Sequence, residues 1–233
     1  MIKNESALLR NVQLFSSLTD QELLQISEKI RIKTFRKNET ILHEEDTNEY
    51  MYTILSGKVK VIQTSEDGKE TILAMHKTGD FFGEMSLIDG KTMPATVLAM
   101  EETLTAIISK QEFILLISMQ GKVLEKLLII LCTRLRESWN KIQMLNFNNA
   151  AQRIKMLFSM LSAEYGEKSV DAITLNIKLT HQDIANMAGV TRETVTRVID
   201  KWQRDKEITV LKNKIIRFHP DFFKKDLQLS TRR

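Results

Sequence analysis

The stretch from Thr180 to Arg197 constrains the fold of this chain more than any other segment. It reads Thr-His-Gln-Asp-Ile-Ala-Asn-Met-Ala-Gly-Val-Thr-Arg-Glu-Thr-Val-Thr-Arg. Thr180 is followed three residues later by Asp183, as in a capping box, and Gly189 suits the left-handed position that ends a helix. Thr191 can cap a second helix, which we expect to run to about residue 205. The pattern predicts two short helices around a tight turn.

The second of these helices has two unlike faces. At about 100° per residue, one face collects the apolar side chains Val195, Val198, Ile199 and Trp202. The opposite face carries Arg192, Glu193, Thr196 and Arg197. Arginine forks match the two acceptors of guanine, and a carboxylate can accept from the cytosine amino group. An ordinary surface helix would also have two faces, but the caps, the turn glycine and the arginine spacing favour a helix that reads the major groove of double-stranded DNA.

The composition is that of a globular protein without a membrane segment. The 233 residues suffice for two modest domains, and the 42% hydrophobic and 27% charged content is ordinary for a soluble chain. The longest apolar run, from Leu127 to Cys132, is too short to span a bilayer, and the first residues lack a leader pattern. We expect a cytoplasmic protein with no membrane contact.

Positive charge gathers in the part that holds the two helices. From Ala150 onward there are 16 Lys and Arg against 10 Asp and Glu, a net charge of +6, whereas the residues before it carry a net charge of −2. A module that binds DNA phosphates requires such a balance.

Other chemistry finds little support in the sequence. The single cysteine, Cys132, cannot hold an iron–sulfur cluster, which takes four thiolates, and we expect it to be a buried core thiol. His76 and His43 have no partner ligands at a telling spacing, which argues against haem and against a metal site. No paired carboxylates, Ser/His/Asp set or phosphate loop stands out, so we do not expect an enzyme.

The first half of the chain changes its pattern near residue 30. Residues 1–30 look helical, with Thr19 as the cap of a helix that begins at Asp20. From Ile32 to about Ile108, short alternating runs are broken by turn residues, among them the Asp67–Gly68 hairpin. Evenly spaced short strands with glycine at the bends predict a small antiparallel barrel or roll.

Residues 111–146 follow a seven-residue repeat. Steps of four and three alternate along Leu124, Leu128, Leu131, Leu135, Ser138, Ile142 and Leu145. This seam predicts a long helix that pairs with a second copy of itself, as in a homodimer. A buried core helix is the alternative, because Leu127, Ile129 and Ile130 widen the apolar surface, and both descriptions can hold. Two-fold symmetry also suits a reader of palindromic DNA.

The end of the chain predicts a winged helix-turn-helix. A helix over 150–164 precedes the two helices, and the strands Glu207–Leu211 and Lys214–Phe218 follow them, joined by Lys212–Asn213. We expect the basic tail after Pro220 to be mobile. The fold class is therefore α+β: an antiparallel β-roll over residues 1–110, a dimerisation helix over 111–146 and a winged helix-turn-helix over 147–233.

This layout resembles the cyclic-AMP receptor protein and fumarate–nitrate regulator superfamily of bacterial transcription factors over nearly the whole chain. Gly79-Asp-Phe-Phe-Gly-Glu-Met-Ser-Leu87 with Ala95-Thr96-Val97 resembles the family's phosphate-binding cassette. Thr191-Arg-Glu-Thr-Val-Thr-Arg197 closely resembles its recognition helix. The resemblance implies a homodimeric regulator that binds DNA and RNA polymerase and is controlled by a small-molecule effector in the roll.

The resemblance also implies roles for the DNA-facing residues. Arg192, Glu193 and Arg197 fall on the base-reading positions of the cyclic-AMP receptor branch, which implies a half-site closer to TGTGA than to TTGAT. His181 stands where relatives often have arginine, which would weaken a charge-assisted contact. The remaining DNA-facing residues implied are Thr180 and Gln182, at phosphate-contacting positions, with Thr191 and Thr196.

The implied effector site departs from the family pattern. It comprises Gly83, Glu84, Met85, Ser86, Met93, Pro94, Ala95, Ser138 and Trp139. Met93 and Pro94 replace an arginine and a serine that hold the cyclic phosphate in relatives, and neither can donate a hydrogen bond from its side chain. Losing a charged hydrogen bond costs about 1.5–3 kcal/mol, which is tenfold or more in affinity.

Trp139 would fill much of the space that a purine uses, or would stack on a different ligand. These departures argue against cyclic AMP and for an unidentified small-molecule effector. Two alternatives stay open from the sequence: a regulator that needs no ligand, and a sensor that acts through protein partners.

Overall fold

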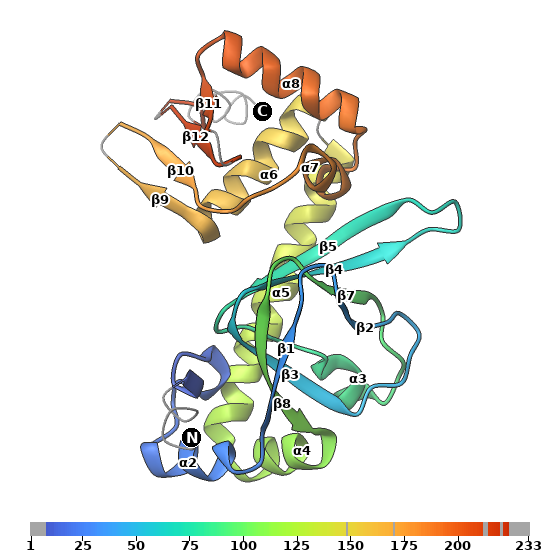
Figure 1. Ribbon diagram of the computed structural model, residues 1–233, viewed down its shortest axis with the longest axis vertical. Helices are drawn as coiled ribbons and strands as arrows, with labels where there is room; N and C mark the ends of the chain where they lie inside the picture. The colour runs from blue at the N-terminus through green and yellow to red at the C-terminus, as the bar shows by residue number, and fades with distance from the viewer. Residues whose placement is uncertain (1–7, 148, 170, 212–213, 220, 224–233) are drawn as a thin grey trace. The chain divides into compact units, whose positions relative to one another are not determined.

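The computed structural model describes residues 8–147, 149–169, 171–211, 214–219 and 221–223 (Figure 1). The chain forms two compact units, Met1–Arg136 and Glu137–Arg233, and the boundary falls within one long helix. The expected α+β class, with an antiparallel roll followed by a helix-turn-helix, is confirmed.

The first unit opens with two short helical segments. These are the 3-10 turn η1 (Gln13–Phe15) and helix α2 (Asp20–Ser27). Thr19 caps α2 as predicted: its side chain accepts from the Glu22 amide, and the Glu22 carboxylate accepts from the Thr19 amide at 2.7 Å. This reciprocal pairing satisfies two amides that the first helical turn would leave unpaired.

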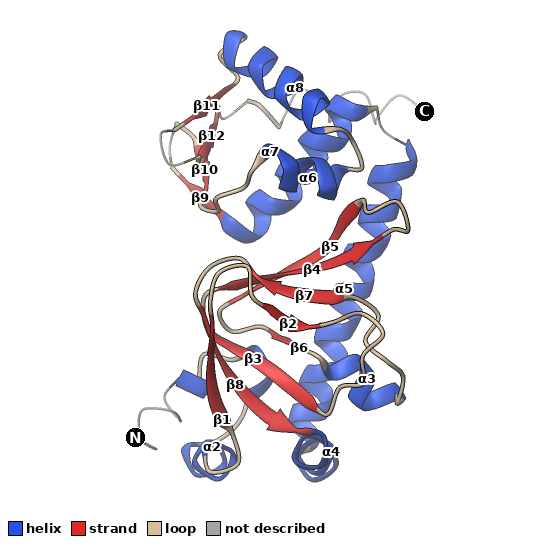
Figure 2. Ribbon diagram, turned by 45° about the vertical axis from the view of Figure 1, so that its right-hand side comes forward, coloured by secondary structure: helices blue, strands red, loops and turns tan. Residues whose placement is uncertain are grey.

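Two four-stranded antiparallel sheets form the predicted roll (Figure 2). One has the order β1-β8-β3-β6 and the other β2-β7-β4-β5. Their bounds are β1 Arg31–Phe35, β2 Thr40–Leu42, β3 Tyr50–Ser56, β4 Lys58–Thr64, β5 Glu70–Lys77, β6 Phe81–Phe82, β7 Thr96–Ala99 and β8 Thr103–Ser109. Gly57 joins β3 to β4 at φ 95°, and a Cβ there would lie 2.6 Å from the Glu102 carbonyl oxygen, so the bend requires glycine.

The interior of the roll holds an apolar cluster next to the predicted cassette. Phe35, Tyr52, Val59 and Phe82 are buried there, and the Tyr52 and Phe82 rings stack with centroids 5.1 Å apart. Met93 belongs to the same cluster and is 6% exposed. The cassette therefore lies directly against the core of the roll.

The single helix expected over 111–146 is in fact two helices. Helix α4 spans Lys110–Met119 and α5 spans Gly121–Phe147, and the chain breaks between them at Gln120, whose φ and ψ are −111° and 85°. Phe113, Val123 and Leu127 are buried against the roll. The break lets both helices cover the roll without following one axis.

Cys132 is exposed, so the prediction of a buried core thiol was wrong. Leu127 faces the core of the first unit, and at about 100° per residue Cys132 lies roughly 140° around α5 from it. The apolar run that suggested burial wraps around the helix instead of following one face.

The second unit contains the helix-turn-helix and a larger sheet than predicted. Its elements are α6 Ala150–Tyr165, β9 Gly166–Lys168, β10 Ile173–Leu175, α7 His181–Ala188, α8 Arg192–Arg204, β11 Ile208–Val210 and β12 Ile216–Phe218. The strands form one antiparallel sheet of order β11-β12-β10-β9, so the predicted two-stranded wing is half of it. The predicted connection Lys212–Asn213 lies outside the described residues.

An aromatic cluster supports α8 from behind. The Phe158, Trp202, Phe218 and Phe222 rings contact one another with centroids 5.0 to 6.2 Å apart. Phe222 is 2% exposed, so the prediction of a mobile tail directly after Pro220 was wrong for this residue. Residues 224–233 lie outside the described part of the chain. In the part that is described, no helix is both long and apolar enough to cross a membrane.

Candidate DNA-reading helix and effector cassette

The first helix of the candidate reader is held at both ends as predicted. At its start, the Thr180 hydroxyl donates to the Asp183 carboxylate at 2.6 Å, and the Asp183 amide donates back to Thr180 Oγ1 at 3.0 Å. At its end, Gly189 adopts φ 62° and its amide donates to the Ala185 carbonyl. These contacts fix where α7 stops and the turn begins.

Helix α8 then presents its polar face to solvent. Thr191 caps it by accepting from the Thr194 amide at 3.2 Å. Val195, Ile199 and Trp202 are buried at 0%, 1% and 8% exposure. Because this face is anchored in the core, the residues on the other side of the helix have a fixed direction. Arg192, Glu193 and Arg197 are exposed there.

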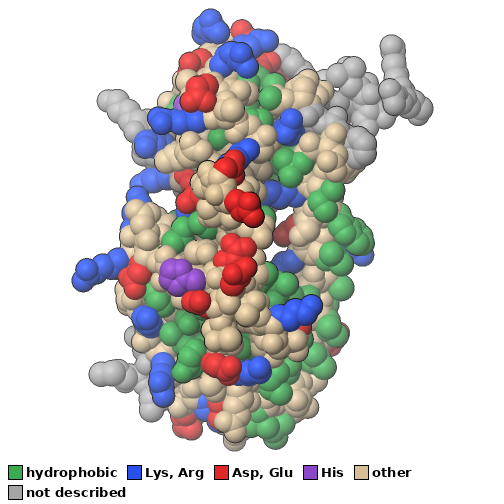
Figure 3. Space-filling view, turned by 90° about the vertical axis from the view of Figure 1, so that its right-hand side faces the viewer, with side chains coloured by type: hydrophobic (Ala, Val, Ile, Leu, Met, Phe, Trp, Pro, Cys, Tyr) green, Lys and Arg blue, Asp and Glu red, His purple; other side chains and the backbone are tan. Residues whose placement is uncertain are grey.

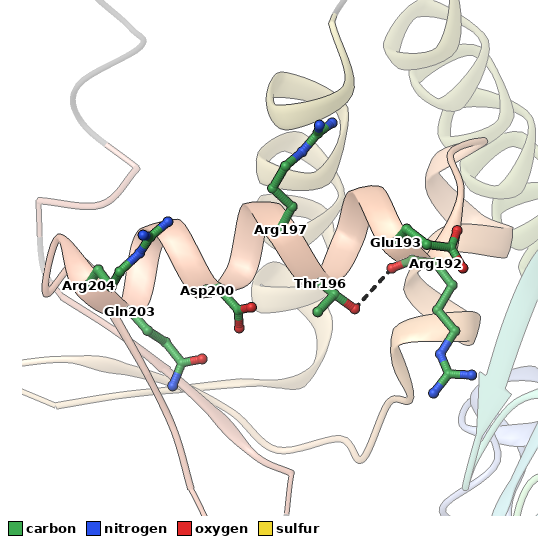
Figure 4. A pocket seen from close by; sticks show the side chains of 7 residues that line it. All are labelled: Arg192, Glu193, Thr196, Arg197, Asp200, Gln203 and Arg204. Atoms are coloured by element: carbon green, nitrogen blue, oxygen red, sulfur yellow. Dashed lines mark hydrogen bonds between the residues drawn. The ribbon is translucent and has the colours of Figure 1, made fainter.

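An open hollow follows this exposed face (Figure 4). It is lined by Arg192, Glu193, Thr196, Arg197, Asp200, Gln203 and Arg204. In the figure, Arg192, Thr196 and Asp200 point to one side of the helix and Arg197 to the other. Asp200, Gln203 and Arg204 had not been predicted, although steps of three and four along the helix from Thr196 and Arg197 would have found them.

Two predicted residues on α7 are engaged in side-chain hydrogen bonds. His181 Nδ1 lies 2.8 Å from Thr196 Oγ1, which ties α7 directly to α8. Gln182 Nε2 donates to Asn186 Oδ1 at 2.7 Å. The predicted DNA-facing set is thus brought together on the two helices of one unit.

The cassette contains β6 and extends into the short helix α3 (Glu84–Asp89). Gly83 precedes α3 at φ 86°, and a Cβ there would lie 2.9 Å from the Tyr50 carbonyl oxygen. Of the residues predicted to bind an effector, Glu84, Ser86, Met93 and Ala95 are buried together with Gly83. Met85 is 53% exposed and Pro94 is also exposed, so these two do not join the buried group.

Met93 fills the space next to the cassette serine. Its Sδ lies 3.4 Å from Ser86 Oγ, and Asn48 Nδ2 lies 3.2 Å from the same hydroxyl. Asn48 also donates to the Gly83 carbonyl at 2.9 Å. Sequence reasoning missed Asn48, since nothing in its surroundings marks it. The Ser86 hydroxyl and the Gly83 carbonyl of the cassette therefore find their partners within the roll.

Arg134 of α5 reaches into the cassette, and sequence reasoning missed it as well. Its Nη1 donates to Glu84 Oε1 at 2.8 Å, its Nη2 donates to the Phe81 carbonyl at 2.6 Å, and its guanidinium lies 4.6 Å from the Phe81 ring centroid. Burial raises the pKa of the Glu84 carboxyl, and the positive charge of Arg134 opposes that rise. The pair connects α5 to the cassette inside the first unit.

The predicted seam of α5 is largely exposed. Leu128, Leu135 and Ile142, spaced by seven residues, are 54%, 51% and 56% exposed. In Figure 3, hydrophobic side chains gather along the edge where α5 lies. Ser138 and Trp139 lie on the part of α5 that belongs to the second unit, and their predicted contact with an effector stays a prediction.

The chain combines a roll that holds a buried cassette, a helix with an exposed apolar seam, and a helix-turn-helix with an arginine-bearing face. These features define a sensor domain joined to a DNA-binding domain. Comparisons with known proteins agree. The family model for the cyclic nucleotide-binding domain matches residues 32–120, and the one for the Crp-like helix-turn-helix domain matches residues 152–220.

Curated relatives extend over most of the chain. The cAMP-activated global transcriptional regulator CRP of Escherichia coli O6:H1 is 32% identical over 186 residues, which cover 78% of this chain and 86% of the relative. The global nitrogen regulator of Synechococcus elongatus is 29% identical and covers 94% of this chain and 96% of the relative. This chain belongs to the cyclic-AMP receptor protein and fumarate–nitrate regulator family of transcription regulators.

The fold is also similar to solved structures. A mutant of CooA from Carboxydothermus hydrogenoformans superposes with a TM-score of 0.76 at 21% identity, covering 89% of this chain and 90% of that chain. This likeness supports the fold alone.

Proposed function

We propose that this regulator acts as a homodimer that reads a palindromic site with TGTGA-like half-sites. The observation that carries the proposal is the exposed face of α8, on which Arg192, Glu193 and Arg197 project from a helix anchored by buried Val195 and Ile199. Arginine supplies the fork for guanine, and glutamate the acceptor for cytosine. The proposal places Thr180, which caps α7, and Gln182, on α7, at backbone phosphates.

The exposed seam of α5 supports the homodimer. Large apolar side chains at Leu128, Leu135 and Ile142 are half-exposed in the single chain, and a second copy would remove them from water. A two-fold dimer presents two copies of α8 to two half-sites, which is what a palindrome requires. By resemblance to the family, the DNA-bound dimer contacts RNA polymerase.

A gel-shift assay tests the reading of DNA. We expect the purified protein to shift a duplex with TGTGA and TCACA half-sites six base pairs apart, and Arg192→Ala to weaken the shift by about tenfold or more. Lys201→Ala is the matched control, because Lys201 is an exposed cation of α8 that does not line the hollow. Equal binding by Arg192→Ala would contradict the assignment. Binding with little dependence on salt would favour a protein partner instead.

The proposed effector of the roll is a small molecule other than cyclic AMP. Met93, buried against Ser86, has no hydrogen to donate to a phosphate, and Pro94 has no backbone N–H. Arg134 couples the cassette to α5, because this side chain of α5 donates to both the Glu84 carboxylate and the Phe81 carbonyl. An effector that displaced this arginine would act directly on the dimerisation helix.

A second candidate is a regulator that binds DNA without any ligand. The specific observation in its favour is that Ser86, Glu84 and Asn48 already have partners inside the first unit. Native mass spectrometry of the purified dimer separates the two candidates. A retained small molecule whose removal abolishes the gel shift supports the effector, whereas an unliganded dimer with full DNA affinity supports the ligand-free regulator.

A further inference from the structure

A side-chain hydrogen bond between His181 and Thr196 links the two helices of the reader on the surface proposed to face DNA. His181 is the first residue of α7 and is partly exposed. Its Nδ1 lies 2.8 Å from Thr196 Oγ1, and that hydroxyl also lies 3.1 Å from the Arg192 carbonyl oxygen, to which it donates (Figure 4). Thr196 stands between Arg192 and Arg197 in the hollow along α8. The imidazole ring therefore lies beside the face that meets DNA.

These two contacts fix where the neutral ring carries its hydrogen. A threonine hydroxyl has one hydrogen, so when it donates to the Arg192 carbonyl it can only accept from His181. Nδ1 must then be the protonated nitrogen, and both contacts are satisfied. The reverse arrangement, with the hydroxyl donating to Nδ1, would forfeit the contact to the carbonyl. Nε2 of the neutral ring is consequently an acceptor, and it has no hydrogen-bond partner among the described residues.

An acceptor cannot bind a phosphate oxygen, because both atoms offer only lone pairs. When the ring gains a second proton, Nε2 becomes a donor and the ring becomes positively charged, while the Nδ1 contact to Thr196 is kept. We propose that His181, oriented by Thr196, binds a DNA backbone phosphate only in its protonated form, so that each subunit takes up a proton from solvent when it binds DNA. This inference rests on the proposed placement of α7 and α8 against DNA.

The charged side chains near the His181 ring do not take the place of a DNA phosphate. Helix α7 itself carries Asp183, whose carboxylate is engaged by the Thr180 amide and hydroxyl at 2.9 and 2.6 Å. The helices packed against α7 carry Arg153, Lys155 and Glu164 on α6, and Arg192, Glu193, Arg197, Asp200, Lys201 and Arg204 on α8. Cations outnumber anions in this set, so these helices offer the ring no excess of negative charge, whereas the DNA backbone does.

Binding to two duplexes at two pH values tests the proposal. One duplex carries the TGTGA palindrome and the other has the same length and a scrambled sequence, since phosphate contacts are independent of sequence. At fixed ionic strength, we expect the wild-type protein to bind both duplexes roughly tenfold more tightly per subunit at pH 6 than at pH 8. The slope of log affinity against log salt should be steeper at pH 6 by about 0.9 per subunit.

Substitutions separate the phosphate contact from a structural role. We expect His181→Arg to bind DNA at pH 8 as tightly as the wild type binds it at pH 6. The salt slope of this variant should be the same at both pH values. His181→Gln should bind weakly at both, also without a change of slope. Thr196→Val removes the hydroxyl that fixes the tautomer, so a neutral ring can place its hydrogen on Nε2 and the pH effect on the scrambled duplex should shrink.

Two outcomes would overturn the proposal. One is that His181→Gln shows the same pH effect and the same change of salt slope as the wild type. The other is that the wild type binds equally well at pH 6 and pH 8. The proposed reading of TGTGA fails separately, if the wild type shows no preference for the palindrome over the scrambled duplex. The pH effect on the scrambled duplex would still decide the role of His181.

Discussion

Met93 stands where the resemblance to the family implies a phosphate-binding arginine, and mutagenesis can restore that arginine. Its side chain is 6% exposed and contacts Ser86, so it takes up room that an anion would need. We expect Met93→Arg combined with Pro94→Ser to gain tenfold or more in affinity for cyclic AMP, because an arginine fork and a hydroxyl return to the cassette. Isothermal titration calorimetry measures the gain.

The matched control is Lys91→Arg, which adds a guanidinium at an exposed position nearby. Lys91→Arg should gain no affinity for cyclic AMP. If the double variant folds, as judged by its thermal unfolding, and still does not bind cyclic AMP, then Met93 and Pro94 are not what excludes the nucleotide.

His76 makes the stability of the roll depend on pH. Burial, with a smaller contribution from the charge of Arg134, lowers the pKa of His76 from 6.5 to about 3. At neutral pH the ring is therefore uncharged, and its 4.0 Å approach to Asp80 is not an ion pair. The unfolded chain takes up the proton first as pH falls, so this contribution to stability is complete above pH 6.5 and is lost between about pH 6.5 and 3.

Urea unfolding at several pH values between 7 and 5 measures this effect. Below pH 6.5, the free energy of unfolding of the wild type should fall with a slope that approaches about 1.4 kcal/mol per pH unit from this residue. His76→Gln should lack that part of the slope, and His43→Gln, at an exposed position, should retain it. Parallel curves for the wild type and His76→Gln would contradict the assignment.

The sequence predicted the roles of single residues where those roles depend on neighbours along the chain. It missed the roles that depend on partners distant in the sequence. The caps of Thr19, Thr180 and Thr191 follow from spacing along the chain, and all three are present. Arg134 and Asn48 act across 50 and 35 residues on Glu84 and Gly83, and no local pattern distinguishes them from other surface residues.

At the scale of the elements, the turn between α7 and α8 depends on Gly189. Its φ of 62° is disfavoured for residues with a Cβ, and a Cβ there would lie 3.0 Å from a methyl carbon of Leu145. We expect Gly189→Ala to lower the free energy of unfolding of the second unit by about 1–2 kcal/mol, measured by urea denaturation. DNA affinity should fall with it.

Gly121→Ala is the matched control, because Gly121 has no atom within 4 Å of its Cβ position and no positive φ. That substitution should leave stability unchanged or raise it slightly. Equal losses in the two variants would show that the backbone conformation of Gly189 is not the cause.

The elements that the sequence missed are short or interrupt a regular pattern. Strands β9 and β10 have three residues each, too few for an alternating pattern to stand out. The break at Gln120 lies before the seven-residue repeat begins at Leu124, so the repeat gave no sign of it. Gly121 beside it was the available indication of a helix boundary.

At the scale of the whole molecule, the proposed dimer depends on the seam of α5. Leu135 is 51% exposed and lies one heptad from both Leu128 and Ile142. We expect Leu135→Glu to weaken dimerisation by at least tenfold, because two carboxylates would face each other across the seam. Analytical ultracentrifugation measures the change. Thr133→Glu adds the same charge on an exposed side of α5 away from the seam and should leave the dimer intact.

The dimer in turn fixes how far apart the two half-sites can lie. Two recognition helices related by a two-fold axis reach major grooves about one helical turn apart, or about 10 base pairs. Inserting five base pairs between the half-sites turns the second one to the opposite side of the duplex. We expect wild-type affinity for the lengthened duplex to fall by roughly a hundredfold, toward that of a single half-site, because the second subunit can no longer bind in place. Leu135→Glu should bind the original and lengthened duplexes alike. Equal wild-type binding to the two duplexes would mean that the half-sites are not read by one rigid dimer.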